Sequence, residues 1–170
     1  LENVEADDVM AYITTNVLPE SKVTIMSSDK DFLQLINDRV EVWSPTKKKI
    51  YTANLVKEEY GVPPQNFCLL RAISGRGDKS DNIGGIKGFG DKTIIKKLPM
   101  LTEDRKIEIK EVIDTAQRII NHPKESDMLL ERLYDGRDIV ERNVKLMQLG
   151  DVDISASTKS KVLERIRQPI

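Results

Sequence analysis

The segment GRGDKSDNIGGIKGFGDKTIIKKL, residues 75–98, is the most informative stretch of this sequence. It holds six of the nine glycines of the chain, two aspartates (Asp78 and Asp81) and a series of lysines. The turn at residues 88–90 precedes a short helix that the apolar spacing predicts over residues 91–98. Glycines allow a backbone to approach a phosphate closely, and the amides at a helix start donate hydrogen bonds to it.

This pattern predicts a helix–hairpin–helix that grips a nucleic-acid backbone without reading its sequence. The alternative is a glycine-rich turn between two helices that binds no ligand. The candidate nucleic-acid-binding residues are Gly85, Lys87, Gly88, Gly90, Lys92, Thr93 and Lys96.

The composition of the 170 residues is that of a globular chain, with 39% hydrophobic and 32% charged residues, and the length suits one domain. No run of about 18 apolar residues is present, so no membrane segment or membrane partner is expected. A net charge of −1 argues against a polycation that coats nucleic acid. The single cysteine, Cys68, cannot form a disulfide framework, so an intracellular, cytoplasmic location is expected.

The order of the expected elements indicates an α/β fold. A helix is predicted over residues 4–18, and the β-branched run KVTIMSS predicts a buried strand followed directly by a helix in DKDFLQLI. RVEVWSPTKKKIYTA predicts two short strands around a polar turn. The remaining helices are expected before Gly61, after Pro64, and over residues 102–121, 124–134 and 155–167.

Three acidic clusters lie where a sheet and its loops can bring them together. They are Glu5-Ala6-Asp7-Asp8 at a helix start, Asp29-Lys30-Asp31 after a strand, and Asp78-Lys79-Ser80-Asp81 in the glycine-rich segment. Taken singly, each cluster is typical of helix capping. Taken as a set, carboxylates in such numbers need cations to remain ionised close together.

The chemistry of the available ligands favours hard divalent cations. With one histidine, His122, and no thiol cluster, the donors are oxygen atoms, which favours Mg²⁺ or Mn²⁺ over Zn²⁺. Two such ions about 4 Å apart form an apparatus for phosphodiester hydrolysis. The catalytic candidates are therefore Asp7, Asp8, Asp29, Asp31, Asp78 and Asp81, and Glu5 joins them as a metal-ligand candidate.

VEADD, SSDKDF and GDKSDNIGGIKGFGDKT, in this order and spacing, resemble the 5′-nuclease family. That family includes phage 5′–3′ exonucleases and flap endonucleases, phage ribonuclease H of the same type, and the 5′-nuclease domain of bacterial DNA polymerase I. The resemblance covers residues 1–100 well and is strongest to the phage members. It implies a PIN-like fold, whose duplex-binding element is a helix–hairpin–helix (helix–three-turn–helix) and whose C-terminal region is helical.

The resemblance also implies roles for the acidic residues. On the family's pattern, Glu5, Asp7 and Asp8 serve one metal site, whereas Asp29, Asp31, Asp78 and Asp81 serve a second. The implied activity is metal-dependent hydrolysis at the 5′ ends and flaps of branched DNA, or of RNA primers on an RNA–DNA hybrid, during replication. In some relatives the duplex-binding element also holds a K⁺ ion on backbone carbonyls.

The family carries earlier acidic strands and a basic helical arch that these residues do not match. We therefore expect the chain to be the later part of one nuclease domain, with residues 1–62 as the metal-site portion, 63–100 as the DNA-binding portion and 101–170 as helical support. The N-terminal half would be a partner, and the chain alone would cut slowly or not at all. Two other functions compete: a non-catalytic DNA-structure-binding module, and a Mg²⁺-dependent phosphatase that leaves the glycine–lysine segment unexplained.

Overall fold

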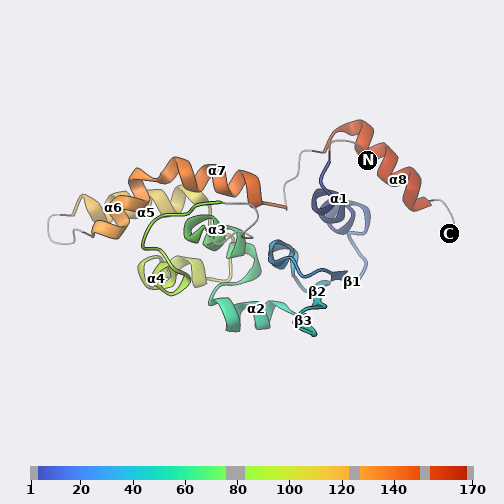
Figure 1. Ribbon diagram of the computed structural model, residues 1–170, viewed down its shortest axis with the longest axis horizontal. Coiled ribbons are helices and arrows are strands. Elements are labelled where there is room, and N and C mark those ends of the chain that lie inside the picture. The colour runs from blue at the N-terminus through green and yellow to red at the C-terminus, as the bar shows by residue number, and fades with distance from the viewer. Residues whose placement is uncertain (1–3, 76–82, 123–126, 150–153, 168–170) are drawn as a thin grey trace. The chain divides into compact units, whose positions relative to one another are not determined.

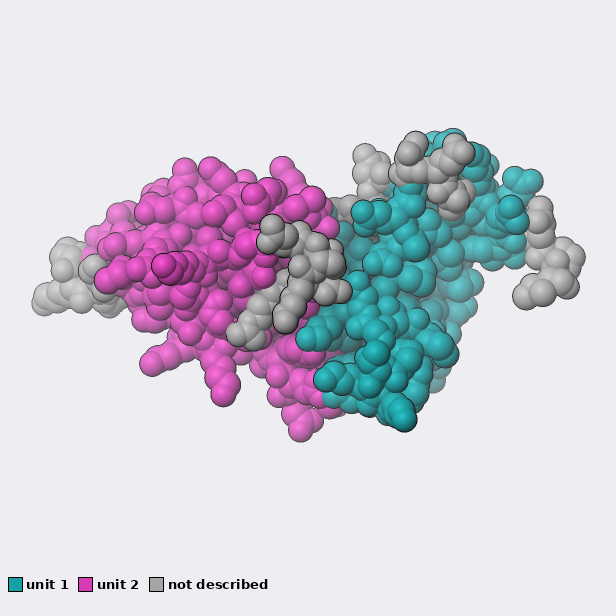
Figure 2. Space-filling view, viewed as in Figure 1, with its two compact units in different colours: residues 1–52, 148–170 teal, residues 53–147 magenta. Residues whose placement is uncertain are grey.

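The computed structural model describes residues 4–75, 83–122, 127–149 and 154–167, and it confirms the expected α/β class. The chain forms two compact units, coloured separately in Figure 2. Unit 1 comprises residues 1–52 and 148–170, and unit 2 comprises residues 53–147. Among the described residues, no helix combines the length and the apolar character needed to span a membrane.

Unit 1 contains the small sheet and several helices (Figure 1). Its elements are α1 (Ala6–Tyr12), a π-helical turn η1 (Ile13–Val17), β1 (Val23–Met26), a 3₁₀ helix η2 (Lys30–Leu35), β2 (Val40–Ser44), β3 (Lys49–Tyr51) and α8 (Ala156–Arg167).

Within the described residues the sheet has three strands in the order β1-β2-β3. β1 and β2 are parallel, with Ile25 opposite Val42, and β2 and β3 are antiparallel. Ile25 and Val42 are buried, and burial of each such side chain stabilises the fold by about 1.5–3 kcal/mol. On the opposite face, Met26, Trp43 and Ile50 lie in register across the strands, and Met26 remains 72% exposed.

The helix predicted after β1 is present as the 3₁₀ helix η2. Its turn of three residues places Phe32 above Leu35, and Leu33 above Ile36. All four side chains are buried, and η2 packs against β2. The tighter helix therefore buries two apolar pairs in little more than one turn.

Arg39 fixes the end of the first helix against the sheet. Its guanidinium donates to the carbonyls of Thr14 (2.7 Å) and Leu18 (2.9 Å), which end the α1–η1 helix. It also donates to the carbonyl of Ser21 at 3.3 Å. These bonds satisfy carbonyls that have no intrahelical partner, so α1 is held beside the start of β2.

Unit 2 is helical in its described part. Its elements are α2 (Ala53–Tyr60), α3 (Pro64–Ser74), α4 (Asp91–Lys97), a 3₁₀ turn η3 (Pro99–Thr102), α5 (Ile109–Ile120), α6 (Met128–Asp135) and α7 (Arg137–Met147). α3 packs against both α4 and α7, and α5 packs against α6. The sequence prediction missed α7, which begins directly after Gly136.

The helix predicted over residues 102–121 begins only at Ile109. The reason is Asn66 of α3, which is fully buried. Its amide nitrogen donates to the carbonyls of Leu101, Glu103 and Arg105 at 3.1, 3.2 and 2.9 Å, and its oxygen accepts from the amide of Ile107 at 2.9 Å. One side chain thus holds residues 103–107, which follow the 3₁₀ turn η3, in a course that is not helical.

Two glycines allow the backbone to cross itself at the end of α3. Gly75 ends the helix in the left-handed conformation (φ 64°), and its amide bonds to the carbonyl of Arg71 at 2.8 Å. A Cβ on Gly75 would overlap the backbone of Gly85, and a Cβ on Gly85 would overlap the backbone of Gly75. These two residues bracket the segment that carries Asp78 and Asp81.

Asn143 of α7 locks this crossing in place. It is fully buried, and its amide donates to the carbonyls of Ala72 and Gly84, both at 2.9 Å. Because buried carbonyls without a partner are costly, this side chain is a structural requirement of the glycine-rich segment.

Candidate metal centre and nucleic-acid interface

The first acidic cluster lies at the start of α1. Glu5 occupies the N-cap position, and Asp7 and Asp8 lie in the first turn. No side-chain capping bond is formed at this end, so these carboxylates are not used as caps. The positive end of the helix dipole stabilises their negative charge.

The second cluster lies directly beyond the carboxyl end of β1. Asp29 is the N-cap of η2, and its Oδ1 accepts from the amide of Asp31 at 2.8 Å. The hydroxyl of Ser27 accepts from the amide of Asp29 at 3.1 Å. The capping function considered for this cluster is therefore present at Asp29, and it uses one of the two carboxylate oxygens.

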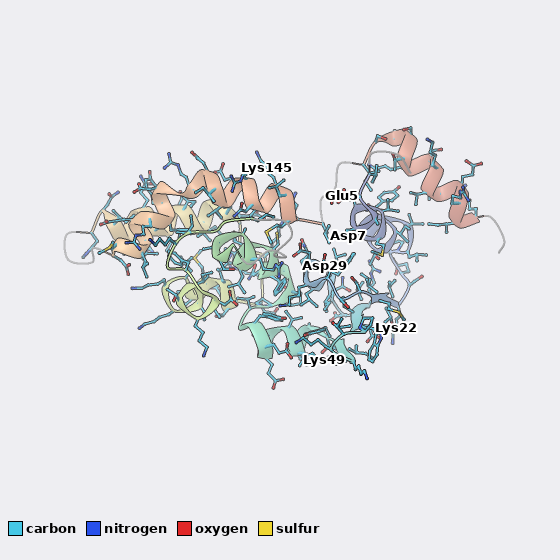
Figure 3. All side chains as sticks on the ribbon, viewed as in Figure 1. Glu5, Asp7, Lys22, Asp29, Lys49 and Lys145 are labelled. Atoms are coloured by element: carbon cyan, nitrogen blue, oxygen red, sulfur yellow. The ribbon has the colours of Figure 1, made fainter. Side chains whose placement is uncertain are left out.

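The structure brings these two clusters together within unit 1 (Figure 3). α1 contacts η2, and the pKa of Asp7 is raised above its ordinary value. Partial burial is the largest cause, followed by the negative charges of Asp29, Glu5 and Asp8. Asp7 and Asp29 are 22 residues apart in the sequence, yet their negative charges repel each other. A bound cation would reduce this repulsion.

The convergence is incomplete in the part of the chain that the structure describes. There, no three acidic, histidine or cysteine side chains come close enough to hold a metal ion. Asp78 and Asp81, predicted to complete the set, lie outside the described residues. Oxygen donors and crowded negative charge fit a hard divalent cation, and the ligand roles of all seven residues stay a prediction.

The glycine–lysine segment lies in unit 2, where the structure shows a turn followed by α4. Gly88 adopts φ 96°, which favours glycine, and Gly90 is the N-cap of α4. The lysines predicted to contact nucleic acid, Lys87, Lys92 and Lys96, are all exposed.

A cavity of about 480 Å³ lies beside the start of α4 and includes Gly90, Lys92 and Thr93 among its lining residues. Gly85 differs from the other candidates because its lack of a side chain is required by the crossing with Gly75. The presence of glycine at position 85 therefore has a structural explanation that does not involve nucleic acid.

Comparison with known proteins identifies the fold. Residues 1–61 match the family described as "5′-3′ exonuclease, N-terminal resolvase-like domain". A 5′-3′ exonuclease of Aquifex aeolicus is 41% identical over 99 residues, which make up 58% of this chain and 34% of the relative. A structure of T5 5′-exonuclease with divalent zinc ions bound matches with a TM-score of 0.71 at 28% identity, over 97% of this chain and 58% of that chain. The resemblance to the 5′-nuclease family is confirmed.

The 5′-nuclease relatives include the thermostable DNA polymerase I of Thermus filiformis, which is 40% identical over 95 residues. These residues make up 55% of this chain and 11% of the polymerase. The chain thus spans about a third of the Aquifex exonuclease and about a tenth of the Thermus polymerase.

The sequence analysis missed a small pocket in unit 1. The pocket lies beyond the carboxyl ends of β1 and β2 and is lined by hydroxyl and lysine side chains. Its members come from separate segments, and only those at residues 27–30 belong to a motif, SSDKDF. The lysine run Lys47–Lys49 and the lysine of SSDKDF, Lys30, were the local signals of positive charge.

The raised pKa of Asp7 predicts how stability depends on pH when divalent cations are absent. A carboxyl whose pKa is higher in the folded state contributes stability that is complete below its unfolded value, near 3.8, and is lost as the pH rises through the folded value. We therefore expect the free energy of unfolding of Asp7→Asn to exceed that of the parent chain by an amount that grows as the pH rises above about 4.

Urea unfolding in EDTA at several pH values measures this gain. Asp38→Asn, at an exposed position of the same unit, controls for the change from carboxylate to amide. A difference between Asp7→Asn and the parent that stays constant over the whole pH range would contradict the prediction.

Proposed function

We propose that this chain is the later part of a metal-dependent 5′-nuclease that hydrolyses phosphodiester bonds at the 5′ ends and flaps of branched DNA. The observation that carries the proposal is the approach of Asp29 to Asp7, because it joins the VEADD and SSDKDF motifs in one acidic site. Relatives named 5′-3′ exonuclease support the reaction, and the zinc-containing T5 5′-exonuclease supports a divalent cation.

Two Mg²⁺ or Mn²⁺ ions, when bound, supply activation of a water molecule and neutralise charge on the scissile phosphate. Glu5, Asp7 and Asp8 would hold one ion, and Asp29, Asp31, Asp78 and Asp81 the other. Within the chain itself, α1 and η2 position Asp7 and Asp29, and the amide of Asp31 fixes one carboxylate oxygen of Asp29.

The duplex-binding element of this proposal is a helix–hairpin–helix over about residues 82–98. Exposed Lys87, Lys92 and Lys96 would contact phosphates, together with the amides at Gly88–Gly90 and the start of α4, and a K⁺ ion would be held on backbone carbonyls there. RNA primers on an RNA–DNA hybrid are a further substrate, and replicating DNA as substrate implies a cytoplasmic protein.

An N-terminal half of the family's fold is the proposed partner within the same nuclease. Among the described residues, β1 is an edge strand with β2 on one side, and Met26 and Ile50 are exposed on the adjacent sheet face. An edge strand and an uncovered apolar face accept further strands and helices. The 58% coverage of the T5 5′-exonuclease chain supports such a partner.

Cleavage of a 5′-end-labelled flap substrate tests the proposal. The assay compares Mg²⁺ with EDTA, using the chain as given and a protein that also carries the N-terminal half. Cutting in the complemented protein with Mg²⁺, and none in EDTA, is the expected result. Tight flap binding without cutting in any sample would indicate a non-catalytic DNA-structure binder instead.

A further inference from the structure

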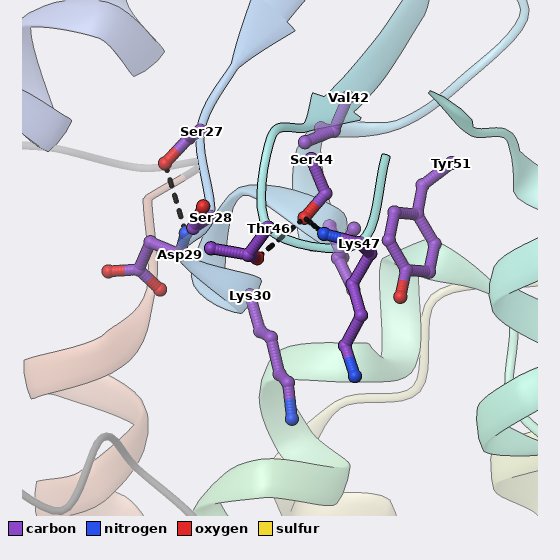
Figure 4. A pocket seen from close by; sticks show the side chains of 10 residues that line it. Ser27, Ser28, Asp29, Lys30, Val42, Ser44, Thr46, Lys47 and Tyr51 are labelled. Carbon is purple, nitrogen blue, oxygen red and sulfur yellow. Dashed lines mark hydrogen bonds between the residues drawn. The ribbon is translucent and has the colours of Figure 1, made fainter. Parts of the chain in front are cut away.

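A cavity of about 110 Å³ opens in unit 1 at the carboxyl ends of β1 and β2 (Figure 4). The turn after β1, the start of η2 and the β2–β3 hairpin all contribute to its wall. Drug-sized ligands occupy pockets of about 300–1,000 Å³, so this cavity suits a small group instead. Its polar side chains decide which group fits.

Two lysines supply the charge of the pocket. Lys30 and Lys47 both line it, and Figure 4 shows that they extend in the same direction. Neither amino group makes an ion pair within the ranges that the structure describes. A third lysine, Lys49, places its Nζ 4.5 Å from the ring centroid of Tyr51 in the pocket wall. The amino groups of Lys30 and Lys47 therefore favour an anionic ligand in this pocket.

Hydroxyl groups supply neutral donors to the same cavity. Ser44 is buried, and its Oγ accepts from the amide of Lys47 (3.4 Å) and lies 3.3 Å from Oγ1 of Thr46. The Oγ of Ser27 accepts from the amide of Asp29. A hydroxyl that accepts one bond still has its own hydrogen to donate. Serine and threonine donors beside lysines are typical of phosphate recognition.

One carboxylate also lines the pocket, that of Asp29. Its Oδ1 is engaged by the amide of Asp31, and in Figure 4 the carboxylate is turned away from the two amino groups. Among the described residues, Lys30 and Lys47 therefore line the cavity without a carboxylate ion-pair partner.

We propose that this pocket binds a phosphate group of a nucleic-acid strand next to the acidic site. The proposal rests on the proposed nuclease function and names a part of its substrate-binding surface. A strand is favoured over free phosphate because Lys48, which is exposed, continues the positive charge of Lys30 and Lys47 along the hairpin, beyond the space that a single phosphate fills.

The test measures binding of a labelled single-stranded oligonucleotide to the whole chain in EDTA, over a range of salt concentrations. Each phosphate neutralised in a single-strand complex adds about 0.7 to the slope of log K against log salt. We expect Lys30→Gln combined with Lys47→Gln to lower this slope by about 0.7. The matched control, Lys22→Gln combined with Lys161→Gln, removes the same charge from exposed positions of the same unit and should leave the slope unchanged.

Amide chemical shifts locate the bound phosphate. The signals of Ser28 and Thr46 should move when the oligonucleotide is added to the parent chain, and should move less in the pocket variant. Equal slopes in the pocket and control variants, or no shift at these amides, would overturn the proposal. Shifts with inorganic phosphate alone, together with an unchanged slope, would overturn the assignment to a strand.

This result is independent of the nuclease assay, because EDTA excludes cleavage. If the pocket variant lowers the salt slope but the protein never cleaves DNA, the phosphate-pocket proposal stands and the nuclease proposal is wrong. If cleavage is normal and the pocket variant leaves the salt slope unchanged, the nuclease proposal stands and the phosphate-pocket proposal is wrong.

Discussion

The Asp29→Asn variant of the complemented protein is expected to cleave a 5′-flap substrate about 10³-fold more slowly than its parent. A divalent cation stabilises the charge of a phosphodiester transition state by several kcal/mol, and each 1.36 kcal/mol corresponds to about a tenfold change in rate. Loss of one anionic ligand weakens that stabilisation directly.

Asparagine is the informative replacement because it keeps the structural role of Asp29. The side chain caps η2 by accepting from the amide of Asp31, and an asparagine oxygen accepts the same bond. The free energy of unfolding in EDTA should therefore change little while the cleavage rate falls. This separates the cap from the metal ligand.

Single-turnover cleavage at saturating Mg²⁺ measures the effect, with Asp38→Asn as the control at an exposed aspartate of the same unit. A cleavage rate within about twofold of the parent would show that Asp29 only caps the helix, and it would remove SSDKDF from the proposed metal centre.

The second large effect is expected at the backbone crossing of unit 2. Gly75→Ala should lower the free energy of unfolding by about 4 kcal/mol, because it adds two costs. A left-handed residue other than glycine costs about 1–2 kcal/mol, and overpacking costs about 1–3 kcal/mol. Here the added Cβ would meet the backbone nitrogen of Gly85, which cannot move aside like a flexible side chain.

Gly84→Ala is the matched control, since nothing lies within 4 Å of a Cβ at that position. It should leave stability unchanged or raise it slightly through the unfolded state. Urea unfolding followed by far-UV circular dichroism compares the two variants. Equal losses at Gly75 and Gly84 would show that the crossing contributes nothing specific.

Local sequence patterns predicted the sheet and its attached elements well. Alternating and β-branched residues located β1, β2 and β3, and the acidic turn after β1 located Asp29. These features depend on neighbours in the chain, so the pattern contains the necessary information. The approach of Asp29 to Asp7 was also expected, because Asp29 follows a strand at its carboxyl end, where ligands of such sheets bind.

The two errors in predicting helices share a different cause. In each, a buried asparagine forms hydrogen bonds with residues far away in the sequence. Asn66 organises residues 101–107, where a helix was predicted, and Asn143 anchors α7, which was missed. Polar residues at such positions weaken the apolar periodicity of their helices, and their partners lie far away in the sequence. The pocket around Lys30 and Lys47 escaped prediction for the same reason, because it is assembled from separate segments.

Asn143 also has a consequence for the order in which the protein folds. Its two acceptors precede it by 71 and 59 residues, so both bonds close long loops and belong to the slow, late events of folding. During synthesis, Gly75 and Gly85 leave the ribosome well before α7 exists to hold them. The crossing of Gly75 and Gly85 is therefore expected to become fixed only when α7, the last helix of its unit, has docked.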